Sequence, residues 1–473
     1  MAQQLATSVA SGIIRGRVAI REFEFDVVGP LKRSEYLQVH HPADGWTLAQ
    51  TASMERFAEG GAERTRARAV VIGVKDEAGV LRLPRTPFSP GDRVFPADPE
   101  LVRRVLGLGD ATGAYLGHLE GTAIPVYVPV NTLVTRHLSV LAKTGGGKSY
   151  ATAVLVEELL ERKVPLVVLD PHGEYGSLKE PSEDPRNMEA FGVSPASYAS
   201  QLAVLTPMSK AIHKEADRVF RLDGINLKPR ELRGVLPDLS PRLHSTLQQA
   251  IQKAAAKKET YRVTDVLGAL DDAKGKDKYE LQARLEELRD SGVLSDSPTT
   301  VDELVAPGRG TVINLKGLDP RLQEVVAARV AHDLFEARKH DRVPPLMLVV
   351  EEAHEFCPEK GFKKAASSDI LRTIASEGRK FGLGLGVISQ RPARIDKNVL
   401  SQCGSQIILR VTNPNDIMVL RKSLEGFTEE MAEDLKRLPP GTAIVATPDI
   451  EKPVTVRVRP RRTRHGGTAK VVG

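Results

Sequence analysis

The sequence predicts an α/β core that follows an N-terminal β-barrel and is interrupted by a helical subdomain. Three observations lead to this fold class: β-rich stretches separated by turns, a strand–helix–strand pattern after them, and a long stretch of helix formers without strand signals. The 473 residues suffice for about three domains, and 41% hydrophobic residues are typical of a globular protein. We expect the barrel at residues 1–125, the core at 126–208 and 301–450, the helical insertion at 209–300 and a basic C-terminal extension at 451–473.

Two regions supply the β-barrel and the start of the core. Residues 12–22, 69–73 and 122–129 are rich in β formers, and turn-forming Gly and Pro residues separate them, which is typical of a small barrel. The core then begins with an apolar strand, a glycine-rich turn, a helix and a second buried strand, which together form a βαβ unit. These elements are expected at residues 138–141, 142–149, 150–162 and 164–169.

The insertion and the second half of the core follow. Helical patterns occupy residues 244–258 and 278–291, whereas strand signals are missing across this part of the chain. Strands then return, so the α/β core is split by the insertion. They are predicted at 310–314, 346–350, 384–388, 406–411 and 442–447.

Composition excludes several classes of protein. The chain has no run of about 18 apolar residues, so we predict no membrane-spanning helix. Its first residues lack the basic and then apolar pattern of a signal peptide. Two cysteines, Cys357 and Cys403, cannot build a disulfide framework or a four-ligand zinc site. We therefore expect a cytoplasmic protein without a membrane partner.

The net charge of +6 resides in the C-terminal extension. From Lys452 onward there are seven basic residues and no acidic ones, whereas the whole chain has 67 basic and 61 acidic residues. The rest of the chain is therefore close to neutral. If residues 1–451 bind a polyanion, the binding must come from a local cluster of basic residues and not from net charge.

Residues 142–149 (Ala-Lys-Thr-Gly-Gly-Gly-Lys-Ser) fit the phosphate-binding loop pattern, with Ala142 in place of the first glycine. The glycines allow backbone N–H groups to converge on phosphates, and the following helix presents its positive N-terminus. We expect Lys148 to reach the β- and γ-phosphates and the Ser149 hydroxyl to bind Mg²⁺. The pattern therefore predicts a nucleotide site that uses ATP and Mg²⁺.

Two carboxylates, Glu351 and Glu352, follow the apolar strand at 346–350. Strand alternation would point their side chains in opposite directions, so we expect different roles for them. Glu352 is assigned to polarising the attacking water and Glu351 to the surroundings of Mg²⁺.

Several motifs together resemble the HerA family of hexameric DNA translocases, which are related to FtsK. They comprise the phosphate loop, Leu-Asp-Pro-His-Gly-Glu-Tyr at 169–175, Glu-Glu-Ala-His at 351–354, Glu-Gly-Arg-Lys-Phe-Gly at 377–382 and Ser-Gln-Arg-Pro at 389–392. The resemblance covers nearly the whole chain and implies a RecA-like P-loop core. One departure is Glu351, which stands where many motors have Asp.

The resemblance also implies roles for further residues. Arg379 is similar to an arginine finger that enters the neighbouring subunit's site, although a helix-end Arg that complements the dipole is the alternative. Gln390 resembles the polar sensor of the γ-phosphate and water, or is a buried strand-end amide. Arg136 resembles a second basic residue at the nucleotide, or is an exposed Arg before a strand. Asp170 could hold the water shell of Mg²⁺, or cap the next turn. The residues assigned to the nucleotide are Arg136, Thr144, Gly145, Gly146, Gly147, Lys148, Ser149 and Tyr150.

A ring of this family would hold DNA in its channel. Lys360, Lys363 and Lys364 lie in the loop after the acidic strand, and one Lys per subunit would already give a strong, sequence-independent phosphate contact, although a solvated loop is the alternative. The basic extension could contact a neighbouring subunit or DNA.

The resemblance implies an ATP-dependent double-stranded DNA translocase and bipolar helicase that acts as a homohexamer. Its implied partner is a NurA-type nuclease, in DNA end resection for homologous recombination. A HerA-like scaffold for another effector in an anti-phage defence complex is the alternative. A conjugation or secretion ATPase is disfavoured because no membrane anchor is predicted.

Overall fold

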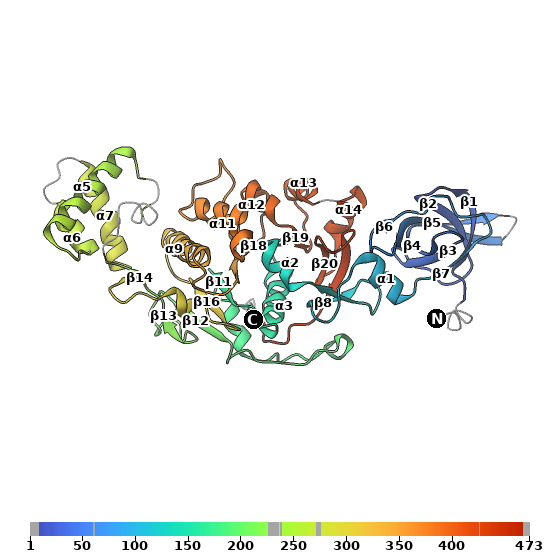
Figure 1. Ribbon diagram of the computed structural model, residues 1–473, viewed down its shortest axis with the longest axis horizontal. Coiled ribbons are helices and arrows are strands. Elements are labelled where there is room, and N and C mark those ends of the chain that lie inside the picture. Colours follow the sequence, from blue (N-terminus) through green and yellow to red (C-terminus); the bar gives the residue numbers. More distant parts are fainter. Residues whose placement is uncertain are drawn as a thin grey trace, which may run out of the picture. The chain divides into compact units, whose positions relative to one another are not determined.

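The computed structural model describes residues 9–59, 62–225, 236, 239–270, 276–424 and 426–466. The chain forms two compact units (Figure 1). The first comprises Met1–Asp110, Gly121–Val126 and Asp449–Lys452, and the second comprises Ala111–Glu120, Tyr127–Pro448 and Pro453–Gly473.

The first unit contains the predicted β-barrel. Its described strands have the order β2-β1-β7-β3-β4-β5, and a further pairing of β2 with β5 closes the barrel. Alternate residues such as Phe23, Phe25 and Leu37 fill the interior, as strand periodicity requires. Closure removes the exposed edges that an open sheet would leave. The elements are β1 (Gly12–Val18), β2 (Glu22–Val27), β3 (Tyr36–His41), β4 (Gly45–Glu59), β5 (Ala62–Lys75), β6 (Leu81–Arg82), β7 (Arg93–Pro96) and α1 (Pro99–Leu106).

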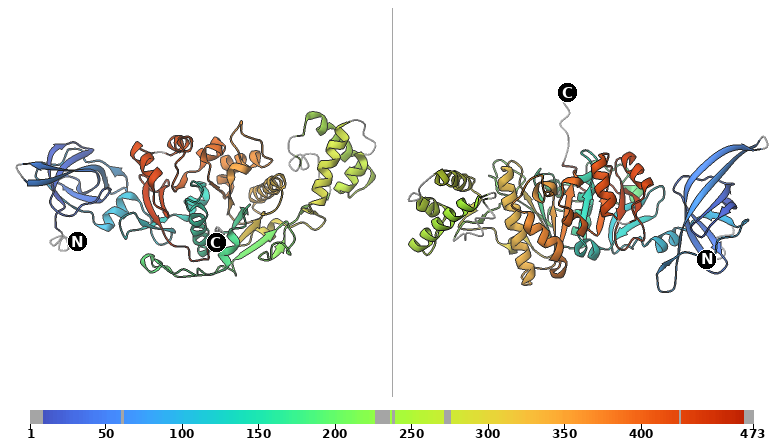
Figure 2. Two further views of the ribbon diagram at one scale, coloured as in Figure 1. Left: turned by 180° about the vertical axis from the view of Figure 1, so that it is seen from behind. Right: turned by 90° about the horizontal axis from the view of Figure 1, so that it is seen from above.

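The second unit is built on one long sheet of order β13-β12-β16-β11-β17-β18-β10-β19-β20-β21-β8-β9. The pairings from β13 to β19 are parallel, whereas β19, β20, β21 and β8 pair antiparallel. Early strands are inserted among late ones, since β11 lies between β16 and β17, and β10 lies between β18 and β19. Figure 2 shows the same part of the chain from behind and from above. The strands are β8 (Ala114–Leu119), β9 (Pro125–Val128), β10 (Leu138–Leu141), β11 (Leu166–Asp170), β12 (Leu202–Thr206), β13 (Arg218–Val219), β16 (Gly310–Asn314), β17 (Leu346–Val350), β18 (Leu383–Ser389), β19 (Ser405–Ile408), β20 (Thr442–Ala446) and β21 (Val454–Val458).

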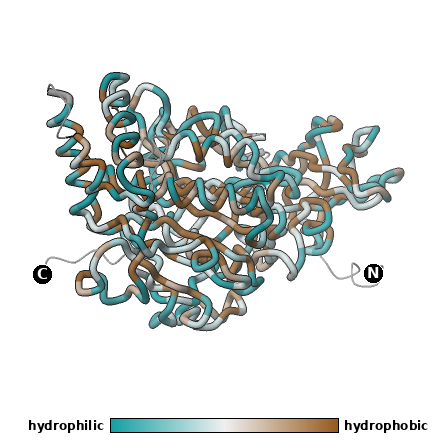
Figure 3. The backbone as a smooth tube through the Cα atoms, turned by 60° about the vertical axis from the view of Figure 1, so that its left-hand side comes forward, coloured by the Kyte–Doolittle hydropathy of each residue, from teal (hydrophilic) through white to brown (hydrophobic). Residues whose placement is uncertain are grey.

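Helices cover both faces of the parallel part of this sheet. Val167 and Leu169 of β11 share a hydrophobic cluster with α9 (Pro320–Lys339) and α11 (Ser368–Phe381). The neighbouring Leu166 lies instead with Leu160 of α3 (Lys148–Glu161) against Gly310. The strands are therefore apolar on both sides, and Figure 3 shows the hydrophobic segments gathered inside the chain. Shorter helices are α2 (Val130–Thr135), α8 (Val301–Leu304), α10 (Ala353–Phe356), α12 (Lys397–Gln402), α13 (Pro414–Ser423) and α14 (Glu429–Arg437).

The predicted helical insertion is present as α5 (Pro241–Lys257), α6 (Val263–Leu270) and α7 (Lys276–Asp290). Helix α5 starts at a Ser240 cap with Pro241 at its first position, and buries one apolar stripe that includes Leu243, Leu247 and Ile251. The short strands β14 (Leu222–Asp223) and β15 (Leu294–Ser295) pair where the insertion leaves and rejoins the core. No helix in the described part of the chain is long and apolar enough to cross a bilayer.

The strands β9, β12 and β21 differ from what the sequence predicted. The stretch at 122–129 forms β9 at the edge of the large sheet and not a barrel strand. Strand β12 was not predicted, and β21 places the start of the basic extension inside the sheet. The reason is that β propensity indicates a strand but does not indicate which neighbour it pairs with.

The basic residues of the C-terminal extension bind their own chain. We call residues 457–466 the C-terminal strap. Arg459 is fully buried, and its guanidinium lies 2.8 Å from Glu157 and 2.7 Å from Glu158, both on α3. Arg462 pairs with Glu161 at 2.6 Å on the same helix. The strap therefore neutralises the acidic end of α3, and its arginines at 459 and 462 are not available as a free cationic arm.

Replacing Arg459 with leucine should lower the free energy of unfolding by about 3–5 kcal/mol, because Glu157 and Glu158 would stay buried without their counter-charge. Urea unfolding of the purified protein measures this loss. The matched control is Arg464→Ala, whose exposed ion pair with Glu180 predicts a loss of about 1 kcal/mol or less. Equally small losses in the two variants would contradict the buried clamp.

Candidate active site

The glycine-rich loop joins β10 to α3. Gly145 and Gly147 have φ angles of 72° and 90°, in the left-handed region where a side chain is strained. Helix α3 begins directly at Lys148, and no side chain caps it. Its first N–H groups thus remain for an anion, which the helix dipole also favours. The loop has the local geometry of a phosphate cradle.

The order of the parallel strands gathers the polar residues around this loop. Strand β18 lies between β10 and β17. Parallel strands end at the same edge of a sheet, so Thr144 after β10, Gln390 after β18 and Glu352 after β17 become neighbours. The structure brings Thr144 beside Gln390, although 246 residues separate them in sequence.

A buried cluster of ionisable groups lies beside the loop. The Lys148 ammonium forms ion pairs with both Glu351 and Glu352, the second at 2.9 Å. The Tyr175 hydroxyl donates a hydrogen bond of 2.8 Å to the other oxygen of Glu351. Lys148 is thus held by two carboxylates beside the loop.

The expectation that Glu351 and Glu352 point in opposite directions is wrong, because both contact Lys148. Strand β17 ends at Val350, so strand alternation no longer applies to either residue. Glu352 adopts φ 50° and ψ 45°, a left-handed conformation that is unfavourable for a side-chain-bearing residue. Such strain is concentrated at functional sites in proteins.

The two carboxylates have different proton affinities. Burial raises the pKa of Glu351 to about 6, and Lys148 and Tyr175 offset only part of this effect. Burial also acts to raise the pKa of Glu352, but the hydrogen bond from His172 and the charge of Lys148 outweigh it and lower this pKa to about 2. Glu352 is therefore ionised near neutral pH, as a residue that polarises water must be.

Gln390 connects the loop to Glu352. Its side-chain oxygen accepts a hydrogen bond from the Thr144 hydroxyl, and its amide nitrogen lies 3.3 Å from Glu352 Oε1. The second oxygen of Glu352 is buried and has no hydrogen-bond partner among the residues that the structure describes, although His354 Nδ1 lies 3.3 Å from it. Gln390 is therefore placed where an amide can sense what occupies the loop and orient a water near Glu352.

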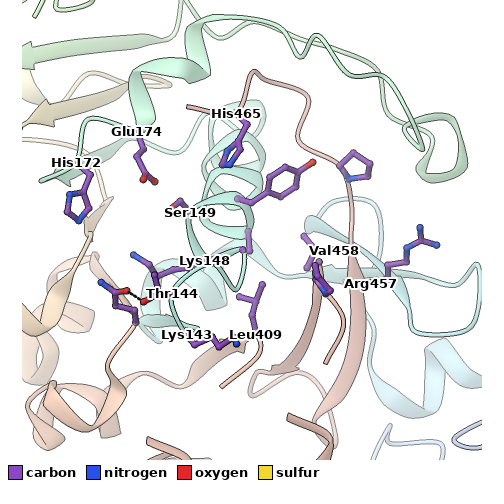
Figure 4. Close-up of a pocket in the computed structure, with 18 of the residues that line it drawn as sticks. Lys143, Thr144, Lys148, Ser149, His172, Glu174, Leu409, Arg457, Val458 and His465 are labelled. Carbon is purple, nitrogen blue, oxygen red and sulfur yellow. Dashed lines mark hydrogen bonds between the residues drawn. The ribbon is translucent and has the colours of Figure 1, made fainter. Parts of the chain in front are cut away.

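These residues line a cavity of about 760 Å³ (Figure 4). One wall comes from the loop and the first turn of α3, including Ser149 and Tyr150. His172, Glu174 and Phe191 form another part, and the C-terminal strap supplies a third. The strap residues are Arg457, Val458, Pro460 and His465.

Sequence reasoning assigned neither the strap nor His172 to the site. The imidazole of His172 lies 3.6 Å from Glu352 and lines the cavity. Only the run of basic residues marked the strap, and that signal did not indicate which part of the protein it contacts. The separation of about 300 residues between the loop and the strap hides this neighbourhood from any local pattern.

Other predicted site residues do not line the cavity. Asp170 is fully buried, and its carboxylate accepts hydrogen bonds from the backbone N–H groups of His172, Gly173 and Tyr175. It therefore caps the turn after β11, which was the alternative interpretation, and it is not among the residues that line the cavity.

Arg136 and Arg379 lie at the amino edge of the sheet, opposite the loop. Arg136 directly precedes the start of β10, and its carbonyl accepts a hydrogen bond of 2.7 Å from Gly404, just before β19. Arg379 lies in the last turn of α11, and its charge adds to burial in lowering the pKa of His137 beside β10. Both side chains are exposed. Neither Arg reaches the nucleotide cavity of its own chain.

The three predicted DNA-binding lysines differ in their surroundings. Lys363 pairs with Glu324 at 3.0 Å and with Glu355 at 2.6 Å, which neutralises much of its charge. Lys360 and Lys364 are exposed and form no ion pair with any residue that the structure describes.

Comparisons with known proteins agree with this geometry. Residues 114–334 match the family described as "Helicase HerA, central domain". The "DNA double-strand break repair helicase HerA" of Pyrococcus furiosus is 27% identical, over 94% of this chain and 91% of its own length. The "Probable DNA double-strand break repair helicase HerA" of Methanocaldococcus jannaschii is 25% identical, over 94% of both chains.

Solved structures share the fold. VirB4 of Thermoanaerobacter pseudethanolicus superposes with a TM-score of 0.53 at 15% identity, over 74% of this chain and 97% of its own. The plasmid coupling protein TrwB in complex with ADP and Mg²⁺ gives a TM-score of 0.52 at 16% identity, over 79% and 94%. The RecA-like P-loop fold expected from the sequence is thereby confirmed. With its phosphate loop, its paired glutamates and relatives along nearly its whole length, this chain is similar to the HerA helicases, whose central-domain model its residues 114–334 match.

Proposed function

We propose that this chain is an ATP-driven DNA helicase or translocase of double-strand break repair. The observation that carries the proposal is the meeting of a phosphate loop, an ionised Glu352 and Gln390 at one edge of the sheet. Relatives that span nearly the whole chain are named as double-strand break repair helicases. Bipolar unwinding and partnership with a NurA-type nuclease in end resection form the finer part of the proposal.

The site can bind and hydrolyse a nucleoside triphosphate with its own residues. The phosphates would occupy the loop and draw Lys148 away from Glu351 and Glu352. The reason is that the phosphates and the two carboxylates compete as anions for one ammonium group. Glu352 would then be free to polarise a water, and Gln390 would orient that water while it contacts Thr144. Lys148 would thus serve both as the counter-charge of Glu351 and Glu352 and as the phosphate ligand.

The residues present fit a magnesium ion that is held mainly by phosphate and water. Ser149 lines the cavity, and Glu352 has a buried oxygen without a hydrogen-bond partner among the described residues. Nowhere in the described ranges do three His, Cys, Asp or Glu side chains gather into a metal site of their own. Mg²⁺ prefers few protein ligands and several waters, and it neutralises charge on the transferred phosphate. Ser149 would bind the magnesium ion, and Glu351 would belong to the surroundings of the ion.

Assembly of several copies would complete the site. Arg136 and Arg379 are exposed at the sheet edge opposite their own loop, so either can reach a nucleotide only from another subunit. A transition-state arginine is worth on the order of 10³–10⁵ in rate. This placement supports a homohexameric ring in which Arg379 acts across the subunit boundary and Arg136 contacts the neighbour's nucleotide. Lys360 and Lys364 would contact double-stranded DNA in the channel.

We expect Glu352→Gln and Arg379→Ala each to reduce ATP hydrolysis by at least about 10³-fold, because one removes the water-polarising base and the other the arginine supplied by the neighbour. Hydrolysis is measured with and without linear double-stranded DNA. A mixture of the two variants should regain activity, since some interfaces then combine an intact Glu352 with an intact Arg379. Arg421→Ala, an exposed Arg on α13, is the control with unchanged activity.

Two results would contradict this scheme. Hydrolysis that DNA does not stimulate in the wild type would favour a scaffold for another effector over a DNA motor. Mixed variants that stay inactive, although each still assembles, would remove Arg379 from the neighbour's site.

Gln390→Leu should lower kcat by about 10²-fold, because the leucine keeps the size but loses the bonds to Thr144 and Glu352. The dissociation constant of a non-hydrolysable ATP analogue should change less than about threefold, since the loop itself stays intact. Steady-state kinetics and calorimetric titration separate the two quantities. Gln249→Leu on the exposed side of α5 is the matched control, and a large loss of nucleotide affinity in Gln390→Leu would overturn the sensor role.

A further inference from the structure

Two segments that start at the active site run side by side to a common tip. One follows Glu352 through α10 to residues 357–364, and the other follows Gln390 to residues 391–397. We call residues 359–364 together with 391–397 the Phe362 tip. Its aromatic residue belongs to neither the hydrophobic core nor the nucleotide cavity.

An exposed aromatic ring and an Arg form the end of this tip. Phe362 is 60% exposed. The guanidinium of Arg394 lies over its ring, 5.5 Å from the ring centre. Such a pair holds the ring in place and leaves its other face open to solvent. An exposed aromatic with a positive partner offers both stacking and phosphate contact.

The charge of the tip favours a nucleic acid over a protein surface. It contains six basic and two acidic residues, in a body that is otherwise near neutral. Lys363 and Lys397 are paired with Glu355 and Glu359, respectively. Lys360, Lys364 and Arg394 form no ion pair with any of the residues that the structure describes. Three unpaired cations around one aromatic ring match the phosphates and bases of a single strand.

Backbone contacts tie the two segments into one unit. The Glu359 N–H donates a hydrogen bond of 2.8 Å to the Arg394 carbonyl, and the Asp396 N–H donates one of 2.9 Å to the Cys357 carbonyl. Asp396 is buried and also binds Arg372 of α11 at 2.8 Å. A displacement at the tip is therefore transmitted to the chain on both sides, and these two stretches lead directly to Glu352 and Gln390.

We propose that the Phe362 tip binds DNA where its strands are separated, with Phe362 stacked on an unpaired base and Arg394, Lys360 and Lys364 on neighbouring phosphates. The inference rests on the proposed function for DNA as the ligand. It adds a contact with bases to the phosphate contacts of the lysines. It also connects bound DNA, through the two segments of the tip, to Glu352 and Gln390, the residues proposed to polarise and orient the attacking water.

Fluorescence anisotropy with a labelled single strand and with its blunt duplex tests the proposal on the full chain. Phe362→Ala should weaken single-strand binding by about tenfold, as loss of one stacked base predicts, and duplex binding by much less. Arg394→Gln should weaken both and reduce the slope of log K against log salt by about one. The DNA concentration for half-maximal stimulation of ATP hydrolysis should rise by the same factor as the dissociation constant.

Tyr279→Ala is the matched control, because Tyr279 is a 70% exposed aromatic on α7 and is not one of the tip residues. It should change neither binding nor stimulation. Unfolding curves of all variants should coincide, since neither Phe362 nor Tyr279 is buried.

The possible results distinguish a failure of the proposed function from a failure of the tip inference. If the wild type bound neither DNA probe, the proposed function itself would fail. If the wild type bound single strands and Phe362→Ala bound them equally well, only the tip inference would be overturned. Loss of oligomeric mass in Phe362→Ala would also overturn it, because the ring would then contact another subunit and not DNA.

Discussion

The buried ion pairs of Lys148 with Glu351 and Glu352 are the interaction on which the architecture depends. None of the three residues is more than 9% exposed, and removing ions from water costs several kcal/mol each unless partners are held in place. The sheet holds them, because β10 and β17 flank β18 and end at the same edge. The two ion pairs balance the charge of Lys148 within the buried cluster. An incoming polyphosphate must replace two carboxylates around one ammonium, so nucleotide binding and release of Glu352 become one event.

Helix α3 links this cluster to the end of the chain. It starts with Lys148 and Ser149 and finishes with Glu157, Glu158 and Glu161. The C-terminal strap binds those acids through Arg459 and Arg462, and then passes over the nucleotide cavity. Arg459 and Arg462, which contribute to the basic pI of the chain, thus hold α3, the helix that begins at the glycine-rich loop. Net charge alone would have suggested a nucleic-acid-binding arm, whereas the pairing shows that two of its arginines are a structural brace.

The residues assigned to the site are distributed over both edges of the parallel sheet. The glycine-rich loop, Glu352 and Gln390 lie at the carboxyl edge, and the exposed Arg136 and Arg379 lie at the amino edge. Neither of these two arginines lines the cavity of its own chain, so only a neighbouring copy could bring them to a nucleotide. The same carboxyl edge gives rise to the Phe362 tip, whose two segments begin at Glu352 and Gln390. The geometry supports a motor in which neighbour, nucleotide and DNA all act on these few residues.

The sequence by itself determined the local elements. Strands β10, β16 and β17 were predicted at their observed bounds, and the loop at 142–149 was identified, because each is a contiguous pattern with its own physical cause. The closed barrel and the helical insertion were also predicted. Only the tertiary structure decided the rest: that Glu351 and Glu352 both turn toward Lys148, that Asp170 caps a turn, and that β9 and β21 join the large sheet. These features depend on strand order and on contacts between residues hundreds of positions apart, and a local pattern of residues carries no information about either.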